Sequence, residues 1–364
     1  MISEWAFEQS QTHGSTWRPQ RLFHNTSWYF YGSRDNFEKA NKEGMLAIDM
    51  GVFDPLTGKT NSEIAALSRS QHKSQGFGSA AALGERTEYL ELIKGKKLYS
   101  NNPFDGINTQ WSRVKGGEPI GKAIEKIIEN FDFSAPHKIA VPLLEVKAMI
   151  AQLENEHWKA IKTEEINTLI LNCLGMELQF NAKIPYGVLG EKIQLQFVVN
   201  HPSPLNIRLE NIEWKDQIFD LNQTVKANKV FRKDYKTEIA GTISSPYWLI
   251  KKGSQGMYTT DKTKWIGKAK TPAAYKASIT LVIEGKKLTT TLPLQHRITD
   301  PVRGEVITPF QILPEASLRL EAPVHLFATG QNRKIKVSVK NLGPSIEGKL
   351  KLETPKSWEL SPKS

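Results

Sequence analysis

The chain has 364 residues, with 49 Lys and Arg against 38 Asp and Glu, and a formal net charge of +11. Its length predicts two or three domains. The positive charge is scattered, without an Arg-rich arm or an aromatic nucleic-acid motif, so we expect no nucleic-acid partner; a mild attraction to anionic glycans or membrane surfaces stays open. No stretch reaches the ~18 continuous apolar residues of a membrane span, and we expect no integral membrane segment.

Roughly the first 80 residues alternate predicted helices and strands, which is typical of part of an α/β layer. Thr60 and Glu63 form a capping box, and the helix that they start is predicted to run to Gln75 and to fray near Gly76 and Gly78. The other elements predicted here are a helix over 2–11, a strand entering a loop over 21–32, a helix over 37–42 and a strand over 44–53.

Residues 121–174 then show helical periodicity in three stretches, which predicts a small helical segment. Glu164 and Glu165 are expected at the solvated start of the third helix. Cys173, the one cysteine of the chain, lies in an apolar run and is predicted to be buried. With a single cysteine the chain cannot form an intrachain disulfide, and the count does not indicate the cellular compartment.

From Met176 the hydrophobic period becomes two, which predicts an antiparallel sandwich. Residues 276–293 read as a hairpin that turns at Glu284–Lys287. Near Pro314 a second β unit begins, with room for about four strands, whereas an immunoglobulin-like sandwich needs ~7. The residues predicted to alternate onto one face are Ile193, Leu195, Phe197 and Val199 in the first unit, and Ile335, Val337, Val339, Leu350 and Leu352 in the second.

Polar residues occupy the second half of the helix that begins at Thr60. Ile64 and Leu67 are predicted to start an inward face, which the polar residues from Ser68 to Gln75 continue at ~100° per residue. His72 lies on its flank. Either this half lines a polar pocket, because a dry core would penalise unpaired polar groups, or the helix simply emerges into solvent.

A second group of candidate residues lies at the predicted strand end. Asn25, Thr26 and Ser27 are small polar residues among aromatics, in a position where α/β folds place ligand groups. The rings of Trp28, Tyr29 and Tyr31 would either stack on a sugar or close the edge of the core. No pair of the eight histidines has the spacing of a metal motif.

Two stretches carry a resemblance to a known family. "RPQRLFHNTSWYFYGSRDNF" and "EIAALSRSQHKSQGFGS" resemble the PIG-L (LmbE-like) N-deacetylases, in particular their long multidomain bacterial members. His72, Ser74 and Gln75 match an H-x-S-Q type signature on a late helix of that family. "SSPYWLI" and "HRITDPVRGE" resemble the β-rich C-terminal half of those proteins, and the final "VKNLGPSIEGKLKLETPKSW" is similar to the sandwich domain attached to many galactosidases.

The resemblance implies metal-assisted hydrolysis of an N-acetyl group, with Zn as the cofactor and N-acetylglucosaminyl compounds as substrates. The family's A-H-P-D-D-E and H-x-x-H motifs supply the metal ligands and the general base, and neither occurs in this sequence. We therefore expect a C-terminal fragment, inactive alone, with no metal ligand or catalytic residue to assign. The residues expected to bind substrate are Asn25, Ser27, Tyr31, His72, Ser74 and Gln75.

The predicted fold class is α/β plus all-β. The chain is divided into the C-terminal portion of a Rossmann-like deacetylase domain (1–100), a helical segment (101–175), a β-sandwich (176–305) and an incomplete second sandwich (306–364). The sandwiches are expected to act as spacers more than as sugar binders, with Trp248 in the core. The alternative function is a noncatalytic carbohydrate- or surface-binding β-sandwich protein. A periplasmic or extracytoplasmic location is expected for full-length relatives.

Overall fold

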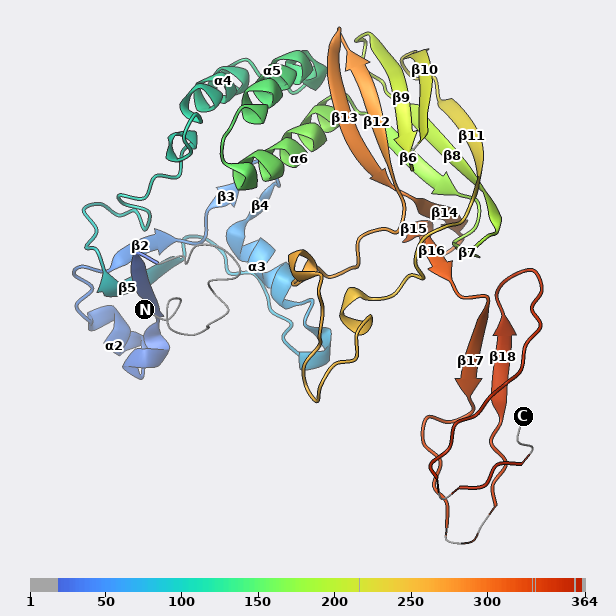
Figure 1. Ribbon diagram of the computed structural model, residues 1–364. Helices are drawn as coiled ribbons and strands as arrows, with labels where there is room; N and C mark the ends of the chain where they lie inside the picture. Colours follow the sequence, from blue (N-terminus) through green and yellow to red (C-terminus); the bar gives the residue numbers. More distant parts are fainter. Residues whose placement is uncertain (1–18, 216, 329, 331, 357, 362–364) are drawn as a thin grey trace. The chain divides into compact units, whose positions relative to one another are not determined.

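The computed structural model describes residues 19–215, 217–328, 330, 332–356 and 358–361. The chain divides into two units, Met1–Thr109 and Gln110–Ser364, here called the N-terminal and the C-terminal unit (Figure 1). The predicted helix over 2–11 lies outside the described residues. Both units mix helices with antiparallel strands, so the chain has mixed α/β content and is rich in β structure.

The N-terminal unit is built on a three-stranded sheet in the order β1-β5-β2. Each neighbouring pair is antiparallel, and the Rossmann-like arrangement expected from the resemblance is therefore not confirmed. The predicted strands form, though shorter than predicted, and a 3-10 helix replaces the loop after the first of them; the short helix lies at Arg34–Lys39 and not at 37–42. The bounds are β1 Arg21–Thr26, η2 Trp28–Tyr31, α2 Arg34–Lys39, β2 Leu46–Asp49, β3 Phe53–Asp54, β4 Lys59–Thr60 and β5 Thr87–Gly95.

Helix α3 spans Asn61–Arg69, and the predicted capping box at its start is confirmed. The Thr60 hydroxyl accepts from the Glu63 N–H at 3.2 Å, while the Glu63 carboxylate accepts from the Thr60 N–H at 2.7 Å. The prediction that this helix runs to Gln75 is wrong. It ends at Arg69, and the backbone beyond it forms shorter turns, with the Gln71 N–H donating to the Ser68 carbonyl and the His72 N–H to the Arg69 carbonyl, both at 3.1 Å.

The predicted inward face of α3 is also wrong. Ile64 and Leu67 are 40% and 53% exposed, whereas Ser62 and Ala66, one turn apart, are the buried side chains of the helix. Small side chains let a helix pack close to its neighbours. The buried face of α3 is therefore set by the size of its side chains as well as by their hydrophobicity.

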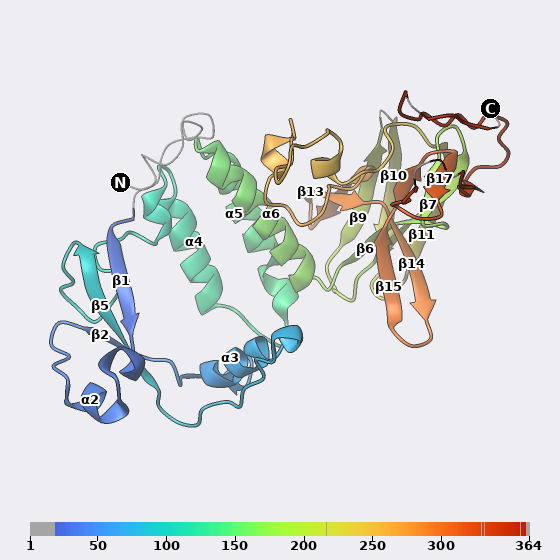
Figure 2. The same ribbon diagram turned by 90° about the horizontal axis from the view of Figure 1, so that it is seen from below.

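Three helices open the C-terminal unit and confirm the predicted helical segment. They are α4 Glu118–Glu129, α5 Ala140–Ala151 and α6 Glu156–Cys173. Figure 2 shows them side by side, with α5 in contact with both neighbours. The last helix starts earlier than predicted, because the Asn155 side chain caps it by accepting from the Trp158 N–H at 3.1 Å. Glu164 and Glu165 therefore lie in the middle of α6 and not at its start.

Two sheets follow, with four strands in the order β10-β9-β12-β13 and five in the order β11-β8-β6-β14-β15. Nearly all their pairings are antiparallel. The predicted hairpin is confirmed, with Glu284 and Gly285 at φ 44° and 80° in its turn. The strands are β6 Glu177–Ala182, β8 Lys192–Asn200, β9 Ile207–Trp214, β10 Gln217–Val225, β11 Phe231–Glu238, β12 Lys276–Ile283, β13 Lys286–Pro293, β14 Gln295–Asp300 and β15 Gly304–Pro309.

The two sheets and the helices share one apolar core, which runs from Val114 to Ile312. The face predicted on β8 is confirmed, since Ile193, Leu195, Phe197 and Val199 are all buried. Within the five-stranded sheet, Phe180 of β6 stacks on Phe197 of β8 with ring centroids 4.3 Å apart, and across to the other sheet it meets Trp214 of β9 edge-on at 5.9 Å. Cys173 is buried in the same core, as predicted. Helices α5 and α6 both contact β13.

The remaining strands are short. Strand β7 (Tyr186–Val188) pairs in parallel with β16 (Gln311–Leu313), and β17 (Ala316–Leu320) pairs with β18 (Val337–Asn341). Within the described part of 314–361, these last two are the strands formed, fewer than the four predicted. Val337 and Val339 lie in β18, while Leu350 and Leu352 lie outside any strand.

Candidate functional site

The candidate residues after α3 lie on a loop from Ser70 to Ser79, here called the Ser70–Ser79 loop. Its two ends are joined, because the Ser70 hydroxyl accepts from the Ser79 N–H at 3.2 Å. Inside it, Lys73–Gln75 form a single 3-10 turn (η3), and Gly76 follows in the left-handed region at φ 68°. Consecutive backbone hydrogen bonds, such as Gln75 N–H to the His72 carbonyl at 3.1 Å, hold this turn.

All three family-signature residues of this loop face solvent. His72, Ser74 and Gln75 are exposed, and the His72 ring lies 6.4 Å from that of Phe77. The guanidinium carbon of Arg69 lies 5.4 Å from the ring centre of the same Phe77. The side chains of His72, Ser74 and Gln75 are therefore accessible to a ligand. They lie on a short loop whose two ends are hydrogen-bonded to each other.

The second candidate group lies at the end of β1. Asn25 is exposed, Ser27 is half-buried, and the Ser27 carbonyl accepts from the Phe30 N–H at 3.0 Å to start η2. Before them, the imidazole Nδ1 of His24 lies 3.8 Å from the carboxylate of its cross-strand neighbour Glu91. Small polar groups at this strand end therefore border the contact between the His24 imidazole and the Glu91 carboxylate.

The aromatic residues beside this group divide between the two roles considered for them. Tyr31 packs against Phe37 at 5.1 Å between ring centres, which fits the closing of a core edge. Tyr29 is 73% exposed, and its ring stands edge-on to that of Trp28 at 6.2 Å. Arg34 lies over the Trp28 ring at 5.8 Å. The exposed platform is therefore formed by Trp28 and Tyr29 and not by Tyr31.

Among residues 19–109, no hydrogen bond, ion pair or ring contact links the Ser70–Ser79 loop to the Asn25, Ser27 and Tyr31 group. Each group is held by its own local contacts. The six residues expected to bind substrate are thus placed on two separate pieces of surface, three exposed on the loop and three around the end of β1.

The sequence reasoning missed a buried acceptor of the N-terminal unit, Asp105. Its side chain is buried and accepts from the Ser100 hydroxyl at 2.6 Å and from the N–H groups of Tyr99 and Ser100 at 2.9 and 2.7 Å. The Ser100 hydroxyl first, and these N–H groups with it, lower the pKa of Asp105. The polar turn "SNNPFD" is its one sequence signal. Its contacts give it a structural role.

The described residues do not fit zinc. A zinc site needs three or four His, Cys, Asp or Glu ligands arranged around one point. Over the part of the chain that the structure describes, no group of three or more such side chains is arranged to hold a metal ion. His201 illustrates the alternative, since it is fully buried, and its two ring nitrogens lie 3.1 and 2.8 Å from the carbonyl oxygens of Ser203 and Val225. No hydrolytic step runs through a metal held by these residues.

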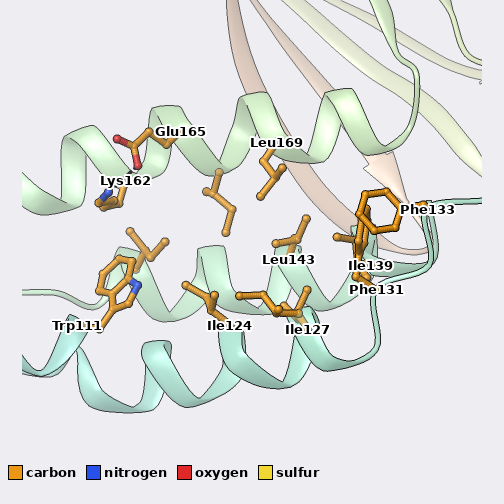
Figure 3. A pocket seen from close by; sticks show the side chains of 13 residues that line it. Trp111, Ile124, Ile127, Phe131, Phe133, Ile139, Leu143, Lys162, Glu165 and Leu169 are labelled. Carbon is orange, nitrogen blue, oxygen red and sulfur yellow. Dashed lines mark hydrogen bonds and ion pairs between the residues drawn. The ribbon is translucent and has the colours of Figure 1, made fainter. Parts of the chain in front are cut away.

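The C-terminal unit has an apolar hollow of about 530 Å³ between α4, α5 and α6. Figure 3 shows Trp111 at one end with Lys162 and Glu165, and Phe133 at the other, with isoleucines and leucines between them. Lys162 and Glu165 pair with each other at 2.7 Å. The hollow thus offers apolar surface and one ion pair.

A second hollow, of about 350 Å³, lies in the segment between β11 and β12 and was missed from the sequence. Trp248 and Tyr258 line it together with Leu249, Lys251, Ser254 and Met257. The prediction that Trp248 belongs to the core is not met, because Trp248 is half-buried while its neighbour Tyr247 takes the buried place.

Comparisons with known proteins leave the function open. No family model matches the chain, and no curated protein gives a significant match. Among solved structures, the alkylpurine DNA glycosylase AlkC of Pseudomonas fluorescens, bound to DNA containing an abasic site analog, matches at 15% identity with a TM-score of 0.17. The match covers 49% of this chain and 53%, about half, of that one. A likeness at that score supports no statement about fold or function.

No helix among the described residues combines the length and the hydrophobicity that crossing a bilayer requires.

Proposed function

We propose that the chain is the C-terminal part of a PIG-L-type N-deacetylase. The N-terminal unit would form the last part of its Rossmann-like domain, with the Ser70–Ser79 loop on the substrate side. One observation carries the proposal: His72, Ser74 and Gln75, the residues that match the family signature, are exposed on a loop whose ends are joined through Ser70 and Ser79. The core of the unit uses none of them.

The proposed task of these residues is to bind and orient a substrate. The Gln75 amide offers both donors and an acceptor, and the Ser74 hydroxyl offers one donor and two lone pairs, which suits the hydroxyl groups of a sugar. The exposed rings of Trp28 and Tyr29 would offer apolar surface to a pyranose face. An N-acetylglucosaminyl compound combines these features. Zinc, held by the A-H-P-D-D-E and H-x-x-H motifs of a longer polypeptide, would supply the polarisation of the amide and the activated water.

The alternative is a noncatalytic, sugar-binding β-sandwich protein, in which the N-terminal unit has only a packing role. The hollow beside Trp248 and Tyr258 favours this alternative, because two aromatic side chains and a lysine line one concave surface.

A deacetylation assay separates the two. Acetate release from an N-acetylglucosaminide is measured with zinc, and again with a chelator, for this chain and for a longer polypeptide in which both metal motifs precede it. We expect chelator-sensitive release from the longer polypeptide alone. Metal-dependent release by the 364-residue chain itself would refute the proposal that the metal ligands lie in motifs outside this chain. No release from this chain or from the longer polypeptide would favour the sugar-binding alternative.

Substitutions in the longer polypeptide test the role of the loop. Gln75→Ala is expected to raise KM about 3–10-fold, the cost of one lost hydrogen bond, with little change in kcat. The matched control is Glu38→Gln on α2, an exposed residue outside both candidate groups, which should leave KM unchanged. An unaltered KM in Gln75→Ala and in His72→Ala would remove the loop from the substrate side.

A further inference from the structure

The segment 239–275, which joins β11 to β12, is an ordered connection held by specific hydrogen bonds. At its start, Ser244 exchanges hydrogen bonds with Ile312 of β16, at 2.8 and 2.9 Å. Further on, the Thr271 hydroxyl accepts from the Tyr247 N–H at 2.9 Å and donates to the Ser245 carbonyl at 3.2 Å. Connections of this length inside a compact domain are commonly functional.

Tyr247 anchors the centre of this segment. It is buried, and its ring meets those of Trp248 at 4.9 Å and Trp265 at 6.1 Å, both nearly edge-on. Its hydroxyl donates to the Lys268 carbonyl at 3.3 Å. The Trp248 ring is therefore held in place before any ligand arrives, which lowers the entropy cost of binding.

A tight turn contributes to the lining of the hollow. Ser254 and Met257 pair as an isolated antiparallel bridge, with the Ser254 N–H donating to the Met257 carbonyl at 3.0 Å. Tyr258 follows the turn and is 69% exposed. The lining of the hollow thus combines the rings of Trp248 and Tyr258 with apolar carbons of Leu249 and Met257.

The segment that forms the hollow carries a net positive charge, since residues 246–270 contain six lysines and a single acid, Asp261. Lys251 is the lysine that lines the hollow, and it pairs with Asp261 at 2.6 Å. An ammonium group has three donors, so Lys251 can bind a second carboxylate as well. A segment with a net positive charge attracts anions.

We propose that this hollow binds an acidic polysaccharide made of uronic-acid pyranose rings. The apolar face of one ring would lie against Trp248 or Tyr258, and its carboxylate would bind Lys251. A phospholipid surface is the other occupant that the exposed Leu249, Met257 and Tyr258 would contact, and it is one of the outcomes that the test distinguishes. The proposal rests on the sugar-binding alternative above and does not require the deacetylase assignment.

The test uses the whole 364-residue chain and titration calorimetry at about 150 mM salt, where long-range attraction is screened. Three probes are compared: tetragalacturonate, its methyl ester, which keeps the rings and loses the charge, and polyphosphate, which keeps charge and lacks rings. None carries an N-acetyl group, so the proposed deacetylase site is not read out. We expect saturable binding of tetragalacturonate, with the ester and polyphosphate at least about tenfold weaker.

Two substitutions locate the site. Tyr258→Ala and Lys251→Gln should each weaken tetragalacturonate binding about tenfold. Tyr258 is largely exposed, so Tyr258→Ala should keep the circular dichroism and melting temperature of the parent. Lys226→Gln, an exposed lysine outside the segment, is the control and should change nothing.

Each other outcome decides against a part of the proposal. Equal binding of the ester would keep a sugar site and remove its acidic specificity. Equal binding of polyphosphate, unaltered in Tyr258→Ala, would reduce the surface to a charge effect. Binding to phosphatidylglycerol vesicles without binding to tetragalacturonate would assign the surface to membranes. No binding of any probe would overturn both this site and the sugar-binding alternative, and would leave the deacetylase proposal standing.

Discussion

The two units of the chain hold their structures by different means. Within residues 19–109, five side chains are buried, and three of them are polar, namely Thr26, Ser62 and Asp105. The C-terminal unit instead encloses a continuous apolar cluster that joins three helices to both sheets. Over its described residues, the N-terminal unit buries mainly polar side chains and is hydrogen-bonded at turns and caps, whereas the C-terminal unit buries a large apolar area.

This difference has a physical consequence. A hydrogen bond contributes roughly 0.5–1.5 kcal/mol, while a fully buried aromatic or aliphatic side chain contributes roughly 1.5–3 kcal/mol through its burial. The candidate residues His72, Ser74 and Gln75 lie in the unit with the sparser core. A surface that is shaped by local turns can present polar groups at little cost to folding, because the core does not need those positions.

The largest effect that we expect from one substitution is in the C-terminal core. Phe197→Ala would leave a cavity between the stacked Phe180 ring and the neighbouring strands and should lower the free energy of unfolding by about 3–5 kcal/mol. Denaturant unfolding followed by tryptophan fluorescence measures it, with the exposed Ile218→Ala as the control. A loss below about 1 kcal/mol would mean that this core is not close-packed.

A smaller effect, and one that depends on pH, is expected at Asp105. Its pKa is lowered in the folded state, so the stability that it contributes is present above its unfolded pKa of about 4 and is lost as the pH falls below that value. Asp105→Asn should lower the protection of residues 99–105 at neutral pH and remove its pH dependence. Hydrogen exchange at several pH values measures this, with Asp35→Asn on α2 as the control.

If instead the acid-induced loss of protection persists in Asp105→Asn, other carboxylates hold this unit. Asp49 is the first alternative, because the N–H groups of Arg86 and Gly51 donate to it at 2.9 and 2.7 Å and lower its pKa.

The smallest effect is expected on the outer face of α3. Leu67→Ser should change the free energy of unfolding by less than about 0.5 kcal/mol, because this leucine is 53% exposed. Ala66→Leu on the buried face should cost about 1–3 kcal/mol through overpacking. Thermal unfolding of both variants measures the contrast. Comparable losses would restore the inward orientation that the hydrophobic pattern predicts for Leu67.

Local chemistry predicted several elements correctly. The Thr60 and Glu63 capping box forms as expected, because the two residues need only each other and the first helical turn. The period-two pattern of β8 placed its buried face correctly, because successive strand side chains must alternate. The hairpin turn at Glu284–Gly285 was also predicted correctly, because its sequence signal lies within a few neighbouring residues.

Other features depend on partners far along the chain. The Ser70 hydroxyl, just past the end of α3, accepts from the Ser79 N–H, and Tyr247, which is buried where Trp248 is not, bonds to Thr271 and Lys268. The arrangement of the candidate site could not be predicted from the sequence either. The sequence resemblance named the residues, but it could not show that they lie on two separate pieces of surface. These residues are Asn25, Ser27, Tyr31, His72, Ser74 and Gln75. The hollow beside Tyr258 had no sequence signal beyond its aromatic and lysine content.

The sequence by itself determined where the strands of the large core alternate, where α3 begins and that Cys173 and one face of β8 enter the large core, because these follow from periods and caps that span a few residues. Only the tertiary structure decided where α3 stops, which of its faces is buried, and which aromatic side chains line a hollow. Those outcomes depend on contacts between residues far apart in the chain, and such contacts form only when the surrounding backbone brings them together.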